Sequence, residues 1–235
     1  MVTSKQIISK RKKFNISQEE LAKVIGVSRP TLSKIEKGER KMTKEEREKM
    51  EAYFEGLGGN EDYIRINIPQ KNIEKFEQVL LYILEKVGAK PNVGMTVLYK
   101  LLYFIDFDYY EKYEEQLMGL TYFKNHHGPT PREFKEVVDR MKKEGKLIEV
   151  PKRFFDKEQI KFLPKIEADL SVLNGRELEM IDDVLKRYSD RTAKELSEMT
   201  HRDIPWQVVD FKENIDYEFA FYRTDEFSVR EYGEL

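Results

Sequence analysis

The 235-residue sequence contains no cysteine, only three histidines and a single tryptophan. Without cysteine the chain cannot form a disulfide bond, a thiol nucleophile or a zinc–thiolate site. The longest apolar runs, Val79–Leu84 and Leu101–Ile105, are too short to span a bilayer. The N-terminus is polar and basic, without the apolar stretch of a signal peptide. We therefore expect a cytoplasmic protein that does not associate with a membrane.

Sequence motifs of several enzyme classes are also missing. There is no His-Glu-x-x-His pair, no nucleophile elbow and no phosphate-binding loop. His126 and His127 are adjacent, and adjacent side chains in an extended turn point in opposite directions, whereas a metal needs three or four converging ligands. We expect no enzymatic activity, no catalytic residues, no metal site and no cofactor.

Charge is divided unevenly along the chain. Residues 1–50 contain 14 lysines and arginines against 7 aspartates and glutamates, a net charge of +7. The whole chain has 42 basic and 44 acidic residues, so residues 51–235 contain 28 and 37, a net charge of −9. A basic surface is common on helical proteins, but it is also what a DNA-binding module needs to neutralise phosphates.

Residues Ile16–Arg40 predict two helices joined by a short turn. Ser17 and Glu20 match the S-x-x-E capping box that starts a helix, and Gly26 is suited to end that helix in the left-handed conformation. Ser28 can cap a second helix, in whose first turn Pro30 is tolerated. This pattern is typical of a helix-turn-helix, which places its second helix in the major groove of DNA. A plain pair of antiparallel helices is the alternative.

Side chains near the start of the second helix favour DNA binding. They are small polar or cationic, the types that contact base edges and phosphates, and Gln18 is placed to touch the sugar–phosphate backbone. The segment QEELAKVIGVSRPTLSKIEKGER resembles the Cro/C1 repressor family (the XRE-type helix-turn-helix) over Phe14 to about Phe54. The resemblance implies operator DNA as a partner, bound by a homodimer. The expected DNA-binding residues are Gln18, Ser28, Arg29, Thr31, Ser33, Lys34, Lys37 and Arg40.

Helix and strand signals continue on both sides of this segment. A first helix is expected from about Ser4 to Lys13, and a capping box at Thr43–Glu46 opens a helix that reaches Phe54. Gly56–Gly59 contains three glycines and marks a flexible boundary. Alternating isoleucines at Tyr63–Ile68 then predict a half-buried strand.

The rest of the sequence predicts an α-rich domain. A helix from Ile73 stops at Gly88, and a long helix from about Thr96 to Glu115 is apolar nearly all round, which is typical of a central buried helix. Later signals predict a strand near Leu120–Phe123, a helix capped at Thr130–Glu133, an antiparallel wing of Leu147–Val150 with Ile160–Leu163, and helices starting at Asn174 and Thr192.

The expected fold is therefore mainly α with small β elements (α+β). Residues 1–55 are expected to form a five-helix-type helix-turn-helix domain, residues 56–70 a linker with a short strand, and residues 71–235 the α-rich domain.

Three separated segments of the second domain together resemble one family. They are Tyr99–Asp106 (YKLLYFID), Tyr122–Pro131 (YFKNHHGPTP) and Thr200–Trp206 (THRDIPW). In this order they are similar to the Panacea domain, which includes the SocA-like antitoxins, over about Ile73–Phe211. The resemblance implies a type II antitoxin that neutralises a cognate toxin by direct binding, while its helix-turn-helix represses the shared operon.

Two other functions stay open. One is a transcription regulator whose second domain senses a ligand or dimerises. The other is an adaptor that delivers a toxin to a protease, as the SocA-like members suggest. The net charge of −9 suits a basic toxin, but it bears on association rate more than on identity.

The family-motif residues have two interpretations. In the structural one, Gly128 and Pro129 shape a turn, His201 caps a helix end, and Asp106 finds a partner because a buried carboxylate needs one. In the functional one, motif residues contact the toxin directly. The residues considered are Tyr103, Asp106, Tyr110, His127, Gly128, Pro129, His201, Pro205 and Trp206.

Overall fold

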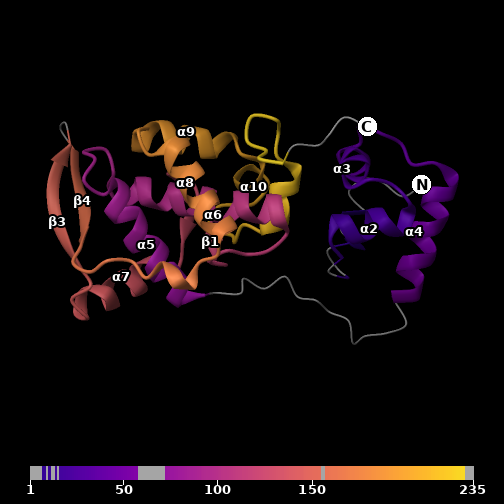
Figure 1. The fold of residues 1–235 in the computed structure, drawn as a ribbon. Coiled ribbons are helices and arrows are strands. Elements are labelled where there is room, and N and C mark those ends of the chain that lie inside the picture. Colours follow the sequence, from indigo (N-terminus) through magenta and orange to yellow (C-terminus); the bar gives the residue numbers. More distant parts are fainter. Residues whose placement is uncertain are drawn as a thin grey trace. The chain divides into compact units, whose positions relative to one another are not determined.

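The computed structural model describes residues 7, 8, 10, 11, 14, 16–57, 72–154 and 157–230, with the backbone alone at residues 55–57 and 157. These residues fall into two compact units, one containing residues 7–57 and the other residues 72–230 (Figure 1). The helix predicted at Ser4–Lys13 lies mostly outside the described residues, and the strand predicted at Tyr63–Ile68 lies outside them entirely.

The first unit contains the predicted helix-turn-helix. Helices α2 (Gln18–Ile25) and α3 (Arg29–Lys37) are followed by α4 (Lys44–Leu57). The five-helix expectation depends partly on residues outside the described ones. Helix α4 continues through Gly56 and Leu57, so the first two residues of the boundary predicted at Gly56–Gly59 are helical, and the other two lie outside the described residues.

Capping residues fix the helix ends of this unit. The Ser17 side chain accepts from the Glu20 N–H at 3.0 Å, but the Glu20 carboxylate accepts from the Tyr53 hydroxyl at 2.9 Å instead of completing a capping box. Gly26 ends α2 at φ 76°, a left-handed conformation that favours glycine. Thr43 and Glu46 form the predicted reciprocal box, at 2.9 and 3.2 Å.

The second unit is built around α6 (Met95–Tyr113), which runs through its middle (Figure 1). Fourteen of the nineteen α6 residues are buried, so the prediction of a central helix apolar nearly all round is confirmed. Helix α8 (Gly175–Tyr188) packs with it, as do α9 (Ala193–Arg202) and the 3₁₀ helix η2 (Tyr217–Tyr222), while α5 (Ile73–Val87) packs against α8. Helices α8 and α9 start after Asn174 and Thr192, as the sequence predicts, and each of these residues forms a full capping box.

Two small antiparallel sheets complete the unit. The wing is longer than predicted: β3 (Leu147–Phe154) pairs with β4 (Lys157–Pro164), with Leu147 opposite Pro164. Figure 1 shows this hairpin at one end of the second unit and α10 (Ile204–Gln207) at the other. A 3₁₀ turn, η1 (Leu170–Val172), follows the hairpin.

The capping box predicted at Thr130–Glu133 is wrong. Thr130 and Pro131 form strand β2, which pairs with β1 (Tyr122–Phe123), and α7 (Phe134–Lys143) begins only after Glu133. The Glu133 carboxylate accepts from the Thr121 N–H at 3.0 Å instead. Strand pairing satisfies the backbone here, so the local helix-start pattern is overridden.

Candidate functional site

Some of the predicted DNA-binding side chains on α3, the second helix of the helix-turn-helix, are exposed, and others are buried. Lys34 and Lys37 are exposed, while Ser28 and Thr31 are half-buried. Only 3% of Arg29 and 6% of Ser33 is accessible. Arg29, Ser33 and Glu36 follow one another at helical spacing, so they share one side of α3 and are covered together. Arg29 and Ser33 are therefore buried in this structure, and their contact with DNA stays a prediction.

Gln18 lies in a buried polar cluster and not at the surface. Its Nε2 donates to Glu36 at 2.7 Å, and the other Glu36 oxygen accepts from Arg11 Nε at 2.9 Å. Arg11 also donates to the Ile16 carbonyl at 2.8 Å. The cluster joins the start of α2 to the end of α3, because a buried carboxylate needs compensating donors. The predicted contact of the Gln18 side chain with the sugar–phosphate backbone is thus not supported by its position.

Arg40 follows α3 and is held by the next helix. Its guanidinium forms a bidentate ion pair with the Glu46 carboxylate, with N···O distances of 3.0 and 2.8 Å. The side-chain hydrogen bond to Glu46 raises the pKa of Arg40. A DNA phosphate would compete with Glu46 for this group.

In the second unit, Asp106 holds the chain that follows α6. Its carboxylate accepts from the backbone N–H of Met118 at 2.8 Å and of Gly119 at 3.3 Å. The Tyr122 and Tyr217 hydroxyls reach it at 2.9 and 3.1 Å. Burial raises the pKa of Asp106 to about 6, although these donors counteract that rise. Asp106 of the first motif therefore has a structural role: it stabilises the segment that follows α6.

Arg223 is a fully buried cation that the sequence analysis missed. Its guanidinium contacts Asp203 at 2.8 Å, Asp108 at 2.6 Å and Glu111 at 3.2 Å. Tyr103 joins the cluster by donating to Asp203 at 2.8 Å. Burial opposes ionisation, but the carboxylates of Asp203 and Asp108 raise the pKa of Arg223 well above its usual range. The cluster ties the C-terminal segment to α6 and to the end of α9.

Lys100 anchors the turn between the two short strands. This fully buried lysine donates to the Pro129 carbonyl at 2.8 Å, and burial lowers its pKa to about 7. Gly128, at φ 96°, lies so close that an added Cβ would meet Lys100 Nζ at 2.9 Å and would also collide with Thr200. The Ser197 hydroxyl donates to the His127 carbonyl at 3.0 Å. The motif segment Tyr122–Pro131 thus packs against Lys100 of the first motif segment and Thr200 of the third.

The remaining motif residues divide between the core and the surface. Tyr110 and Pro205 are buried, and the Tyr110 hydroxyl donates to Glu218 at 2.6 Å. His127 is exposed, whereas Trp206 is half-buried and stacks on His201 at 4.3 Å between ring centroids. Burial lowers the pKa of His201, and the charge of Lys100 lowers it further. Most motif residues therefore build the fold, so they are not available to a partner.

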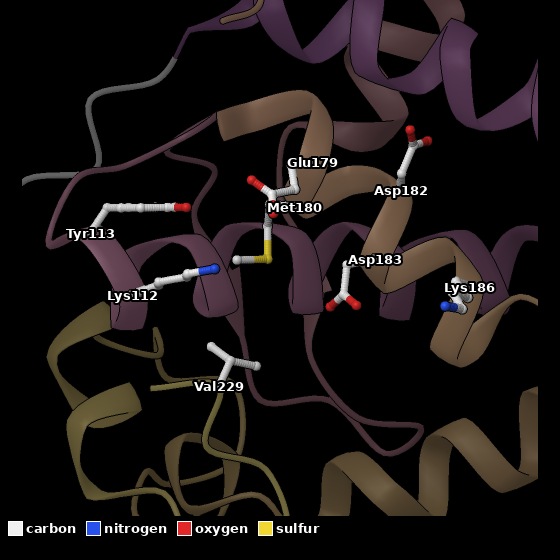
Figure 2. Close-up of a pocket in the computed structure, with 8 residues that line it drawn as sticks. All are labelled: Lys112, Tyr113, Glu179, Met180, Asp182, Asp183, Lys186 and Val229. Carbon is white, nitrogen blue, oxygen red and sulfur yellow. The ribbon is translucent and has the colours of Figure 1, made fainter. Parts of the chain in front are cut away.

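A hollow of about 390 Å³ lies between α6 and α8 (Figure 2). Five of its eight lining residues are exposed charged side chains, with Tyr113, Met180 and Val229 as the others. Small-molecule sites are predominantly apolar with a few placed polar groups, so this lining suits water better than a ligand. Within the described residues, no cluster of three or more His, Asp or Glu side chains is arranged to hold a metal. Nor does any described helix have the length and apolar character to cross a membrane.

The geometry defines a class of protein: a helix-turn-helix unit joined to an α-rich unit whose signature residues are mostly internal. Residues 7–55 match the family described as Helix-turn-helix, and residues 98–207 match the family described as Antitoxin SocA-like, Panacea domain. The two matches confirm both resemblances found in the sequence, and the second match contains all three motif segments. Comparison with curated proteins and with solved structures gave no match.

Proposed function

We propose that this protein is the antitoxin of a type II toxin–antitoxin pair. The observation that carries the proposal is the presence of a helix-turn-helix match and a SocA-like Panacea match in one chain. The second unit would bind and neutralise a cognate toxin protein, and the first would repress the operon as a homodimer on operator DNA. The protein would act in the cytoplasm without catalysis.

The accessible face of the recognition helix supports the DNA-binding half. Ser28 and Thr31 are partly accessible near its start, and Lys34 and Lys37 are exposed along it. With the +7 charge of residues 1–50, these side chains suit phosphate and base contacts. The buried side chains of Arg29, Ser33 and Gln18 could contact DNA only after a rearrangement that exposes them.

Co-expression with the product of the adjacent gene tests the toxin-binding half. We expect that product to stop growth alone and growth to recover when the full-length protein is present. The two should also co-purify at a fixed stoichiometry. A harmless neighbour, or toxicity that the full-length protein does not relieve, would refute the proposal.

The same experiment separates the open alternatives. A blocking antitoxin leaves the toxin level unchanged, whereas an adaptor for a protease lowers it, which an immunoblot against the toxin measures. A ligand-sensing regulator would rescue nothing and would change its DNA affinity with a metabolite.

A further inference from the structure

One surface of the second unit combines exposed apolar side chains with cations. It is formed by two segments, residues 123–132 and residues 206–214. The backbone N–H of Lys124 donates to the Glu213 carbonyl and that of Lys212 to the Lys124 carbonyl, both at 2.9 Å. Phe123 also forms a bridge with Asn214. The two segments therefore form one continuous surface, which we call the motif surface because the second and third family motifs lead into it.

The motif surface contains the two most exposed large apolar side chains of the described chain. Val208 is 52% exposed and Phe211 is 47% exposed, the highest values among the exposed large apolar residues described. The His126 ring lies on Phe211 with 4.3 Å between centroids. A large aromatic side chain left half in water is a candidate anchor for a protein partner.

Three cations lie over aromatic rings of the motif surface. Lys124 Nζ lies 4.2 Å from the Trp206 ring centre, Lys212 Nζ lies 4.9 Å from that of Phe211, and the Arg132 guanidinium lies 4.5 Å from that of Phe123.

The polar partners of these cations are neutral. Lys124 donates to the Val209 carbonyl at 2.8 Å, Arg132 to the Asn214 side chain at 2.8 Å, and Lys212 to the Asn125 side chain at 3.3 Å. Among the described residues, none of the three forms an ion pair. Asp210 and Glu213 lie in the same turn, but Glu213 accepts from the Asp210 N–H. With three cations against the two carboxylates of Asp210 and Glu213, the two segments have a net charge of +1, whereas residues 51–235 together have a net charge of −9.

We propose that the motif surface is the toxin-docking face, and that the toxin presents an acidic side chain next to an apolar one. The proposal rests on the proposed function and adds the location and chemistry of its interface. An acidic group would complete the ion pairs missing for Lys124, Lys212 and Arg132, and an apolar group would cover Phe211 and Val208. A nucleic acid fits less well, because the −9 charge repels a long polyanion and the unit's own cations already cover the Phe123 and Trp206 rings.

Two full-length variants and two matched controls test the location. Phe211→Ala and Lys212→Glu are on the motif surface. Ile166→Ala and Lys165→Glu alter an equally exposed apolar–cation pair that follows β4. Affinity for the purified product of the adjacent gene is measured by calorimetry at low and high salt.

We expect each motif-surface variant to weaken binding about tenfold or more. The Lys212→Glu effect should shrink at high salt, and each control should change affinity less than about twofold. Circular dichroism melting and operator binding of the same variants exclude misfolding as the cause.

Unchanged toxin affinity in both motif-surface variants would overturn the docking site while leaving the antitoxin function standing. A wild-type protein that binds no toxin would instead refute the proposed function. A random-sequence 20-nucleotide RNA is the competing probe: RNA binding that is lost in Lys212→Glu, without loss of toxin binding, would also overturn the proposal.

Discussion

Single residues explain most of the family pattern in the second unit. Asp106, Lys100 and Arg223 are ionisable groups buried in or against the central helix, each with specific partners. Such groups are costly to bury alone, and their partners come from distant parts of the chain. They hold the segments on both sides of the motifs in place.

Removing the Arg223 cation should be strongly destabilising. We expect Arg223→Met to lower the free energy of unfolding by about 3–5 kcal/mol, because the buried carboxylates of Asp203 and Glu111 lose their counter-charge and Asp108 is left with Arg187. Urea denaturation of the full-length protein measures this, with the exposed Arg191→Met as control. Without the cation, burial raises the pKa of Asp108 and Glu111 further, so the loss should be larger at pH 8 than at pH 5. A loss that does not depend on pH would contradict this account.

Lys100 should make stability depend on pH. Burial lowers its folded pKa to about 7, while the pKa of a lysine in the unfolded chain is about 10.4. Between these values the unfolded chain binds more protons, so stability rises as the pH rises. Relative to Lys100→Met, the wild-type protein should gain up to about 1.4 kcal/mol per pH unit between about pH 7.5 and 9. Parallel denaturation curves, with the exposed Lys135→Met as control, measure the difference; equal pH dependence in all three proteins would show that Lys100 stays charged.

At the scale of elements, the turn between β1 and β2 is where the three motifs meet. It packs on α6 through Lys100 and on α9 through Ser197. Gly128 is required there for two separate reasons: its positive φ and the absence of space for a Cβ. The turn is therefore a tightly specified part of the fold and also the base of the motif surface.

A methyl group at residue 128 should disturb this junction. We expect Gly128→Ala to lower the free energy of unfolding by about 2–4 kcal/mol, from left-handed strain and overpacking against Thr200 and Lys100. Gly175→Ala is the matched control, since its Cβ would meet nothing within 4 Å. Thermal denaturation compares the two, and a similar midpoint for both would contradict the packing argument.

At the scale of the whole molecule, two compact units carry opposite charge and matches to two different families. Among the described residues their cores are separate clusters, one of nine buried apolar residues in the first unit and a much larger one around α6. Separate cores allow a change in one unit to leave the other folded. The two proposed activities should therefore be separable by mutation.

The double variant Lys34→Ala, Lys37→Ala tests this separation. Binding to operator and to random DNA should weaken to a similar extent, and the slope of affinity against salt should fall by about 1 for each DNA phosphate that is no longer neutralised. Rescue from the toxin should be unaffected. Lys44→Ala on α4 serves as the control for DNA binding, and loss of rescue in the double variant would show that the two units act together.

The sequence alone predicted the features that depend on residues close together in the chain. The caps at Ser17, Ser28, Asn174 and Thr192 and the buried α6 follow from interactions within one or two helical turns. The motif segments were also recognisable, because their order along the chain is local information.

Only the tertiary structure decided which groups meet across the fold. Arg223 pairs with Asp108 across 115 positions, and Thr130 joins a strand although its local pattern favours a helix cap. Gln18 turns inward because Glu36 needs a donor, and His126 and Phe211 meet at the surface from segments far apart in the sequence. These outcomes depend on which buried charge finds a partner and which backbone group is satisfied by pairing. Neither can be predicted from local sequence periodicity, because both depend on residues far apart in the chain.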